Sequence, residues 1–189
     1  MKLSARFEEA LAYAAHLHAG QLRKGTKIPY VAHLLSVASI ALRHGANEDE
    51  ASAALLHDAV EDQGGAATRR EIRRRFGENV ARIVDGCTDT DVTPKPPWKP
   101  RKEAYIAHVR NAPASVRLVS AADKLDNARA ILADYRQVGE DIWKRFTGGK
   151  AGTWWYYRSL VQAFRENGSS RLIDELDGVV SEIERLAGK

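Results

Sequence analysis

Apolar residues recur at helical spacing along nearly the whole chain, and glycines interrupt the pattern at short intervals. Over residues 5–18, for example, apolar side chains fall on one stripe, and Gly20 follows. An apolar stripe with a period near 3.6 residues is typical of an amphipathic helix packed against a core. We find no convincing alternation of apolar and polar residues, which a half-buried strand would show. The pattern predicts an all-α fold built from many helices.

Capping residues and glycines predict where the individual helices begin and end. Asn47 with Glu50, and Thr68 with Glu71, have the spacing of capping boxes, which predicts a helix start at both places. The segment 136–150 fits neither helix nor loop clearly. The expected helices cover residues 5–18, 31–42, 48–62, 68–77, 78–85, 101–110, 114–133, 153–166 and 170–187.

A proline-rich segment interrupts the helices in the middle of the chain. Four of the six prolines lie in DTDVTPKPPWKPRK, residues 89–102. Proline lacks the amide hydrogen and clashes with the preceding helical turn, so this segment predicts a loop at about 90–101. The 189 residues are enough for one domain with a substantial core. We therefore expect a single multi-helix domain over residues 1–189, with this loop inside it.

Charge and composition narrow the class of ligand. The net charge of +4 suits an anionic ligand such as a nucleotide but is too small to indicate nucleic-acid binding. No apolar run approaches the length of a membrane span, and Glu8 and Glu9 stand where a secretory signal would be apolar. The single cysteine, Cys87, is expected to fill space in the core. These features favour a cytoplasmic protein that contacts neither membranes nor nucleic acid.

The stretch ALLHDAVEDQ, residues 54–63, carries an unusual cluster of acidic groups. His57 and Glu61 are four residues apart, as are Asp58 and Asp62, so a continuous helix would place all four on one side. Carboxylates are unfavourable at a helix C-terminus, where the helix dipole is negative. A metal ion is the obvious source of compensating charge. A solvated acidic helix end is the alternative.

Two further residues complete a candidate metal site. His33 lies just inside the second expected helix, and Asp123 lies in the apolar helical run VSAADKLDNARAI. A carboxylate in such a run should be paired or bound to a metal. The alternative is an ion pair with Lys124 or Arg129, and the pair with Lys124 is disfavoured because adjacent helical residues do not face one another.

Two imidazoles and two carboxylates suit manganese, iron or magnesium, with water completing the coordination, and lack the thiolates of a structural zinc site. Such an ion turns a bound water into a nucleophile near neutral pH. Glu61 and Asp62 are then free to orient or deprotonate that water, or to protonate a leaving group.

The order of three motifs, RKGTKIPYVAH, LLHDAVED and ADKLDNAR, resembles the hydrolase domain of the RelA/SpoT family within the HD phosphohydrolase superfamily. It is particularly similar to the stand-alone small alarmone hydrolases. The resemblance extends from Ala14 to Ile131. It implies an all-helical domain that binds one Mn²⁺ ion and removes pyrophosphate from the 3′ position of guanosine tetra- and pentaphosphate.

The resemblance also implies roles for individual residues. By it, the metal ligands are His33, His57, Asp58 and Asp123, the catalytic acidic pair is Glu61 and Asp62, and the nucleotide contacts are Arg23, Lys24, Asn127, Lys150 and Trp154. Lys150 and Trp154 stand where the family has arginine and tyrosine, and Leu34 stands where it usually has proline. Two alternatives are a hydrolase of another nucleotide phosphate and a nucleotide-binding regulator without catalysis. The intact Glu61–Asp62 pair disfavours the regulator.

Overall fold

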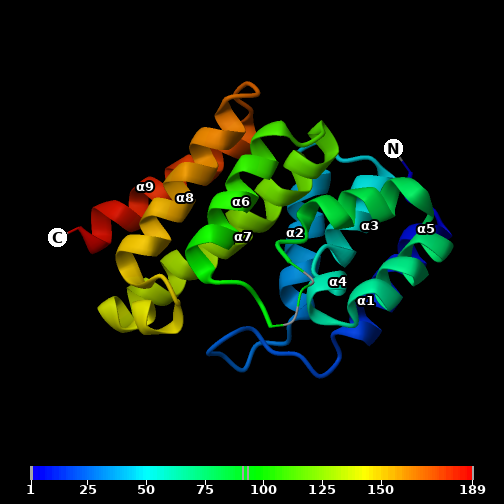
Figure 1. Ribbon diagram of the computed structural model, residues 1–189, viewed down its shortest axis with the longest axis horizontal. Coiled ribbons are helices and arrows are strands. Elements are labelled where there is room, and N and C mark those ends of the chain that lie inside the picture. The colour runs from blue at the N-terminus through cyan, green and yellow to red at the C-terminus, as the bar shows by residue number, and fades with distance from the viewer. Residues whose placement is uncertain (1, 91, 93, 189) are drawn as a thin grey trace.

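The computed structural model describes residues 2–90, 92 and 94–188, which form a bundle of helices joined by loops (Figure 1). No strand occurs in these residues, and an isolated antiparallel bridge joins Leu22 to Pro29. The predicted all-α fold is confirmed. The elements are α1 (Ala5–Leu17), α2 (Val31–Arg43), α3 (Glu48–Leu56), α4 (Ala59–Asp62), α5 (Gly65–Cys87), α6 (Trp98–Asn111), α7 (Ala114–Val138), the 3₁₀ helix η1 (Gly139–Arg145), α8 (Gly149–Arg165) and α9 (Arg171–Ala187).

Helix α7 lies at the centre of the bundle and packs against α2, α3, α5 and α9. Helices α8 and α9 lie toward one end of the molecule, and α1 and α5 lie toward the other (Figure 1). One cluster of buried apolar side chains extends from Ala10 to Ala187, which supports the single-domain prediction. Among the described residues, no helix combines the length and the apolar character needed to cross a bilayer.

The two predicted capping boxes have different outcomes. The Asn47 side chain accepts a hydrogen bond from the amide of Glu50, and the Glu50 side chain accepts one from the amide of Asn47, as predicted. The box at Thr68 is wrong. Helix α5 starts before Thr68, whose hydroxyl donates to the carbonyl of Gln63.

The predicted helix over residues 48–62 is wrong in one respect, because His57 and Asp58 form a turn that divides it into α3 and α4. Asp58 occupies the N-cap position of α4, and Glu61 and Asp62 lie in its first turn. Because α4 is four residues long, this turn is also its last, and the helix dipole gives carboxylates no clear preference there. The dipole argument from the sequence therefore does not apply, and the need for a cation must come from the site itself.

Boundaries elsewhere also differ from the sequence pattern. Gly77 has a φ of 88° and interrupts α5, at the predicted junction of two helices. Helix α6 begins at Trp98, inside the predicted loop, because Pro100 lies in the first turn, where proline is tolerated. The ambiguous segment 136–150 contains the last turn of α7, η1 and the start of α8.

Candidate metal and substrate site

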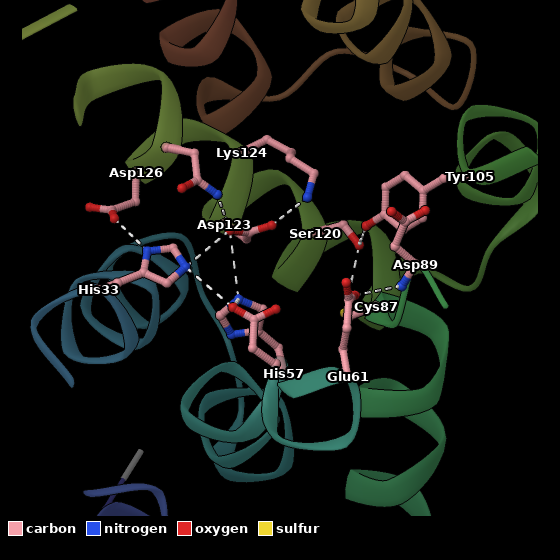
Figure 2. Close-up of polar contacts among 12 residues, drawn as sticks. His33, His57, Glu61, Cys87, Asp89, Tyr105, Ser120, Asp123, Lys124 and Asp126 are labelled. Carbon is pink, nitrogen blue, oxygen red and sulfur yellow. Dashed lines mark hydrogen bonds and ion pairs between the residues drawn. The ribbon is translucent and has the colours of Figure 1, made fainter. Parts of the chain in front are cut away.

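The structure brings the four predicted metal ligands together, and Figure 2 shows three of them, His33, His57 and Asp123. His33 comes from α2, Asp123 from α7, and His57 and Asp58 from the turn between α3 and α4. One atom each of His33, His57 and Asp58 lies within 4.8 Å of the others. Asp123 Oδ1 lies 3.2 Å from His33 Nε2 and 3.6 Å from His57 Nε2. Asp58 Oδ2 lies 3.7 Å and 3.0 Å from the same two nitrogens.

The hydrogen bonds of the two imidazole rings leave one nitrogen of each ring facing the carboxylates. His33 Nδ1 lies 2.6 Å from Asp126 Oδ2, and His57 Nδ1 lies 2.9 Å from the carbonyl oxygen of Ala54. Because both partners are acceptors, Nδ1 carries the proton and Nε2 of a neutral ring keeps its lone pair.

Both Nε2 atoms are buried, and neither has a hydrogen-bond partner among the described residues. Buried polar atoms are normally paired. Two unpaired imidazole nitrogens beside two carboxylates are the donor set that a divalent cation requires, so these residues fit the metal implied by the sequence motifs.

The charges of the cluster also favour a cation. Burial opposes ionisation of Asp58, but the adjacent His57 outweighs it and holds the pKa of Asp58 well below its usual range. Lys124 has the same effect on the pKa of Asp123. Burial opposes charge on His33 too, yet the surrounding carboxylates favour a charged ring and raise the pKa of His33 to about 9. The carboxylates therefore draw protons onto the imidazoles, and a divalent cation would displace those protons.

The carboxylate of Asp58 has an outer partner that the sequence analysis did not assign. The hydroxyl of Tyr30 donates to Asp58 Oδ2 over 2.6 Å, and the Tyr30 ring stacks on His18 at 5.2 Å. Tyr30 is the last residue of the stretch RKGTKIPY and lies three residues before His33, and this short spacing was the available signal.

On α7, Lys124 and Asn127 both donate to Asp123. The Asn127 contact follows from their four-residue spacing. The sequence argument against an Asp123–Lys124 pair is wrong, because the long lysine side chain folds back to its neighbour.

Glu61 and Asp62 contact different loops. Glu61 Oε1 accepts a hydrogen bond from Lys95 Nζ over 2.7 Å, and Glu61 Oε2 accepts one from the amide of Asp89 over 3.3 Å. Both partners belong to the segment that leads into α6. Asp62 Oδ2 instead accepts from Gln21 Nε2 over 2.8 Å, in the loop after α1. The catalytic role of the two carboxylates stays a prediction.

Two pockets, each of about 290 Å³, adjoin the cluster of ligands. Lys24, Asn127, Phe146 and Tyr157 line both of them. Arg23 lines the first pocket and donates to Asn127 Oδ1 over 2.8 Å. The second pocket is rich in cations, with Lys24, Arg101, Lys102 and Lys124 on its walls. Asn127 and Lys124 therefore connect the pockets directly to Asp123, and the predicted contacts Arg23, Lys24 and Asn127 lie together.

Lys150 and Trp154 lie outside the linings of these two pockets. Lys150 Nζ pairs with Glu140 at 2.9 Å and lies 5.3 Å from the centre of the Trp154 ring. Contact between these two residues and a substrate stays a prediction. The aromatic residue of α8 that lines both pockets is Tyr157, which the sequence analysis did not select.

Comparison with known proteins identifies the family and several relatives of this chain. Residues 10–154 match the HD domain family. The chain is 41% identical over 122 residues to guanosine-3′,5′-bis(diphosphate) 3′-pyrophosphohydrolase MESH1 of Xenopus tropicalis, covering 64% of this chain and 66% of that protein. It is 37% identical over 127 residues to the enzyme of the same name from Drosophila melanogaster, covering 67% of this chain and 69% of that one. The match thus spans about two thirds of the length of these relatives.

The fold is similar to a solved structure described as a metazoan orthologue of SpoT that hydrolyses ppGpp. The TM-score is 0.78 and the identity 27%, over 97% of this chain and 98% of the other. The chain therefore belongs to the HD-domain family, as its three RelA/SpoT-like motifs predicted.

Proposed function

We propose that this protein is a cytoplasmic, metal-dependent hydrolase that releases pyrophosphate from the 3′ position of guanosine tetra- or pentaphosphate. The observation that carries the proposal is the pair of unpaired, buried Nε2 atoms of His33 and His57 facing Asp58 and Asp123. The activity printed in the names of the relatives supports this choice of substrate.

The four ligands would hold one Mn²⁺ ion, since imidazole nitrogens and carboxylate oxygens without thiolates suit that metal. When bound, the ion supplies a Lewis acid beside the scissile phosphate and lowers the pKa of a water molecule.

The remaining chemistry falls to side chains of this chain. Hydrolysis of a 3′-diphosphate ester consumes one water, removes a proton from it and returns a proton to the ribose 3′ oxygen. Glu61 and Asp62 are the carboxylates next in the chain after the ligands, and we assign these proton transfers to them. Glu61 is paired with Lys95, so release of that lysine would free a carboxylate oxygen for the water.

The pockets account for binding of the nucleotide. The diphosphates are strongly anionic, and Arg23, Lys24 and the cations of the second pocket offer them hydrogen-bonding partners. We assign contact with the nucleoside to Asn127 and Tyr157, since both line the two pockets.

The direct test is incubation of Mn²⁺-loaded protein with guanosine tetraphosphate, followed by measurement of pyrophosphate release. A parallel panel of other nucleotide phosphates tests the alternative substrate class. Activity should disappear with excess chelator and return with Mn²⁺. Full turnover in chelator by protein that contains no metal would refute the metal-dependent mechanism.

Charge-removing variants test the assigned proton transfers. Glu61→Gln and Asp62→Asn keep the shape of each side chain and leave all four ligands intact. Turnover should fall by roughly 10²–10⁴-fold while metal content is retained. Glu78→Gln is the matched control, because Glu78 is an exposed carboxylate in an ion pair with Arg73. Near-parental turnover in both variants would remove Glu61 and Asp62 from the mechanism.

A further inference from the structure

Asp126 contacts the metal site although no sequence motif assigned it a role. It lies on α7, three residues after Asp123 and therefore on the same side of the helix. Its Oδ2 is 2.6 Å from His33 Nδ1, and its Oδ1 accepts a hydrogen bond from the hydroxyl of Ser36 (Figure 2 shows the His33 contact). His33 and Ser36 lie one turn apart on α2. Asp126 thus joins α7 to two residues of α2.

The two imidazoles of the site are held by different kinds of acceptor. His57 Nδ1 faces the backbone carbonyl of Ala54, whose position the helix itself fixes. His33 Nδ1 faces a side-chain carboxylate, at a sequence distance of 93 residues. The His33 side chain is 1% exposed, and the Asp126 side chain is 18% exposed. The hydrogen bond to His33 Nδ1 therefore comes from a side chain, which a substitution can remove.

We propose that Asp126 is a positioning residue of the metal site, which keeps the proton of His33 on Nδ1 and directs Nε2 toward Asp58 and Asp123. The inference rests on the metal-dependent function proposed above. A carboxylate that accepts from the outer nitrogen of a ligating histidine fixes its tautomer and makes the inner nitrogen a better electron donor. Ser36 completes the arrangement, because its hydroxyl occupies the other oxygen and turns the carboxylate toward the ring.

A structural link between α2 and α7 is the competing explanation for the same contacts. Such a link would contribute to folding stability and would leave the metal affinity of the folded protein unchanged. A positioning residue instead changes the affinity for the metal, whatever the change in stability. The affinity of the folded protein for Mn²⁺ therefore separates the two.

The experiment is calorimetric titration of metal-free protein with Mn²⁺, for the parent and for Asp126→Ala and Asp126→Asn. Asp126→Ala should weaken Mn²⁺ binding by roughly 10–100-fold, the usual effect of removing such a partner. Asp126→Asn should lose less, because its amide oxygen can accept from Nδ1 as the Ala54 carbonyl does for His57. If Asp126→Ala does not fold, the Mn²⁺ affinity of Asp126→Asn is compared with that of the parent instead.

Asp85→Asn is the matched control. It removes a partly exposed carboxylate from an ion pair on α5, and it should bind Mn²⁺ like the parent. Parental Mn²⁺ affinity in every folded Asp126 variant would overturn the proposal.

A second measurement follows the ring itself. With diamagnetic Zn²⁺ bound, the parent should show a downfield, slowly exchanging proton resonance for His33 Nδ1–H, and Asp126→Ala should lack it. If that resonance persists in Asp126→Ala, another group holds the ring and the proposal is wrong. The proposed function and the positioning role can fail separately. If the parent is active and the Asp126 variants bind Mn²⁺ like the parent, only the positioning role is refuted. A parent that binds no Mn²⁺ refutes both.

Discussion

Replacing Gly86 by alanine should force α5 away from α7, the helix that carries Asp123. Gly86 lies in the last turn of α5, which packs against α7. A Cβ at this position would lie 2.6 Å from Val116 Cγ2 and 2.9 Å from Val116 Cγ1. Favourable contacts between carbon atoms lie at about 3.5–4.0 Å, so the overlap is roughly 1 Å. Val116 is buried and β-branched, so it cannot rotate away without strain.

The expected loss of stability follows from two opposing terms. Alanine is favoured over glycine inside a helix by about 1 kcal/mol at most. Overpacking a core costs about 1–3 kcal/mol, and an overlap of this size against a stiff side chain belongs in the upper part of that range. The free energy of unfolding of Gly86→Ala should therefore fall by about 1–2 kcal/mol.

Gly178→Ala is the matched control for this prediction. Gly178 lies on the exposed side of α9, and an added Cβ would meet nothing within 4 Å. This variant should gain about 0.5–1 kcal/mol of helix propensity without a clash. The two substitutions should thus differ by about 1.5–3 kcal/mol, or by about 3–12 °C in Tm.

Urea unfolding followed by circular dichroism measures the difference, on metal-free protein. The cost of Gly86→Ala should also shrink in a Val116→Ala background, because the atoms in conflict are then absent. If Gly86→Ala is as stable as Gly178→Ala, the close approach of α5 and α7 is not as described.

Two further predictions concern single side chains. Burial raises the pKa of the Cys87 thiol to about 11 from an unfolded value of 9.0, so folding favours the neutral thiol. That stabilisation is present below pH 9 and is lost as the pH rises toward 11. Native protein should therefore resist thiol-labelling reagents at pH 8, and rapid native labelling would contradict this. Arg23→Ala and Lys24→Ala should each raise the KM for guanosine tetraphosphate by roughly 10–100-fold, the worth of a hydrogen bond to a charged group, with little change in Tm. Arg70→Ala on the exposed side of α5 is the control, and unchanged KM values would make the Arg23–Lys24 loop a solvated segment.

The sequence predicted those features of the fold that depend on local pattern. Helical periodicity placed α1, α2, α7 and α9 within a few residues, and the Asn47 box fixed the start of α3. The turn at His57 was not predicted, because the segment LLHDAVED contains neither glycine nor proline and every residue in it tolerates a helix. Helix α4, which follows this turn, packs against α5, and such a tertiary contact is not visible in the local sequence. The early start of α6 was missed because Pro100 was treated as a breaker, although the first helical turn accepts proline.

The candidate site shows a similar division. Motif spacing identified the four residues that converge, but the partners that hold them are long-range contacts. Asp126 meets His33 only because α7 packs against α2, and a single sequence contains no information on that packing. Lys150 and Trp154 were chosen by their spacing in the resemblance, and spacing alone does not show which side of α8 faces the pockets.

The stability of the chain gives an independent reason to connect this cluster with a cation. Burying ionised groups such as Asp58 and Asp123 costs several kcal/mol per ion before any compensation, and apolar residues of similar volume are often as stable or more stable. When both rings are neutral, the Nε2 atoms of His33 and His57 are buried without a hydrogen-bond partner, which adds a desolvation cost. A bound cation that pairs with both nitrogens and both carboxylates offsets these terms, and it stabilises the folded state in proportion to RT ln(1 + [M]/Kd). The arrangement is therefore unfavourable for folding alone and favourable for binding a cation, which is an independent physical argument for the metal-dependent function proposed above.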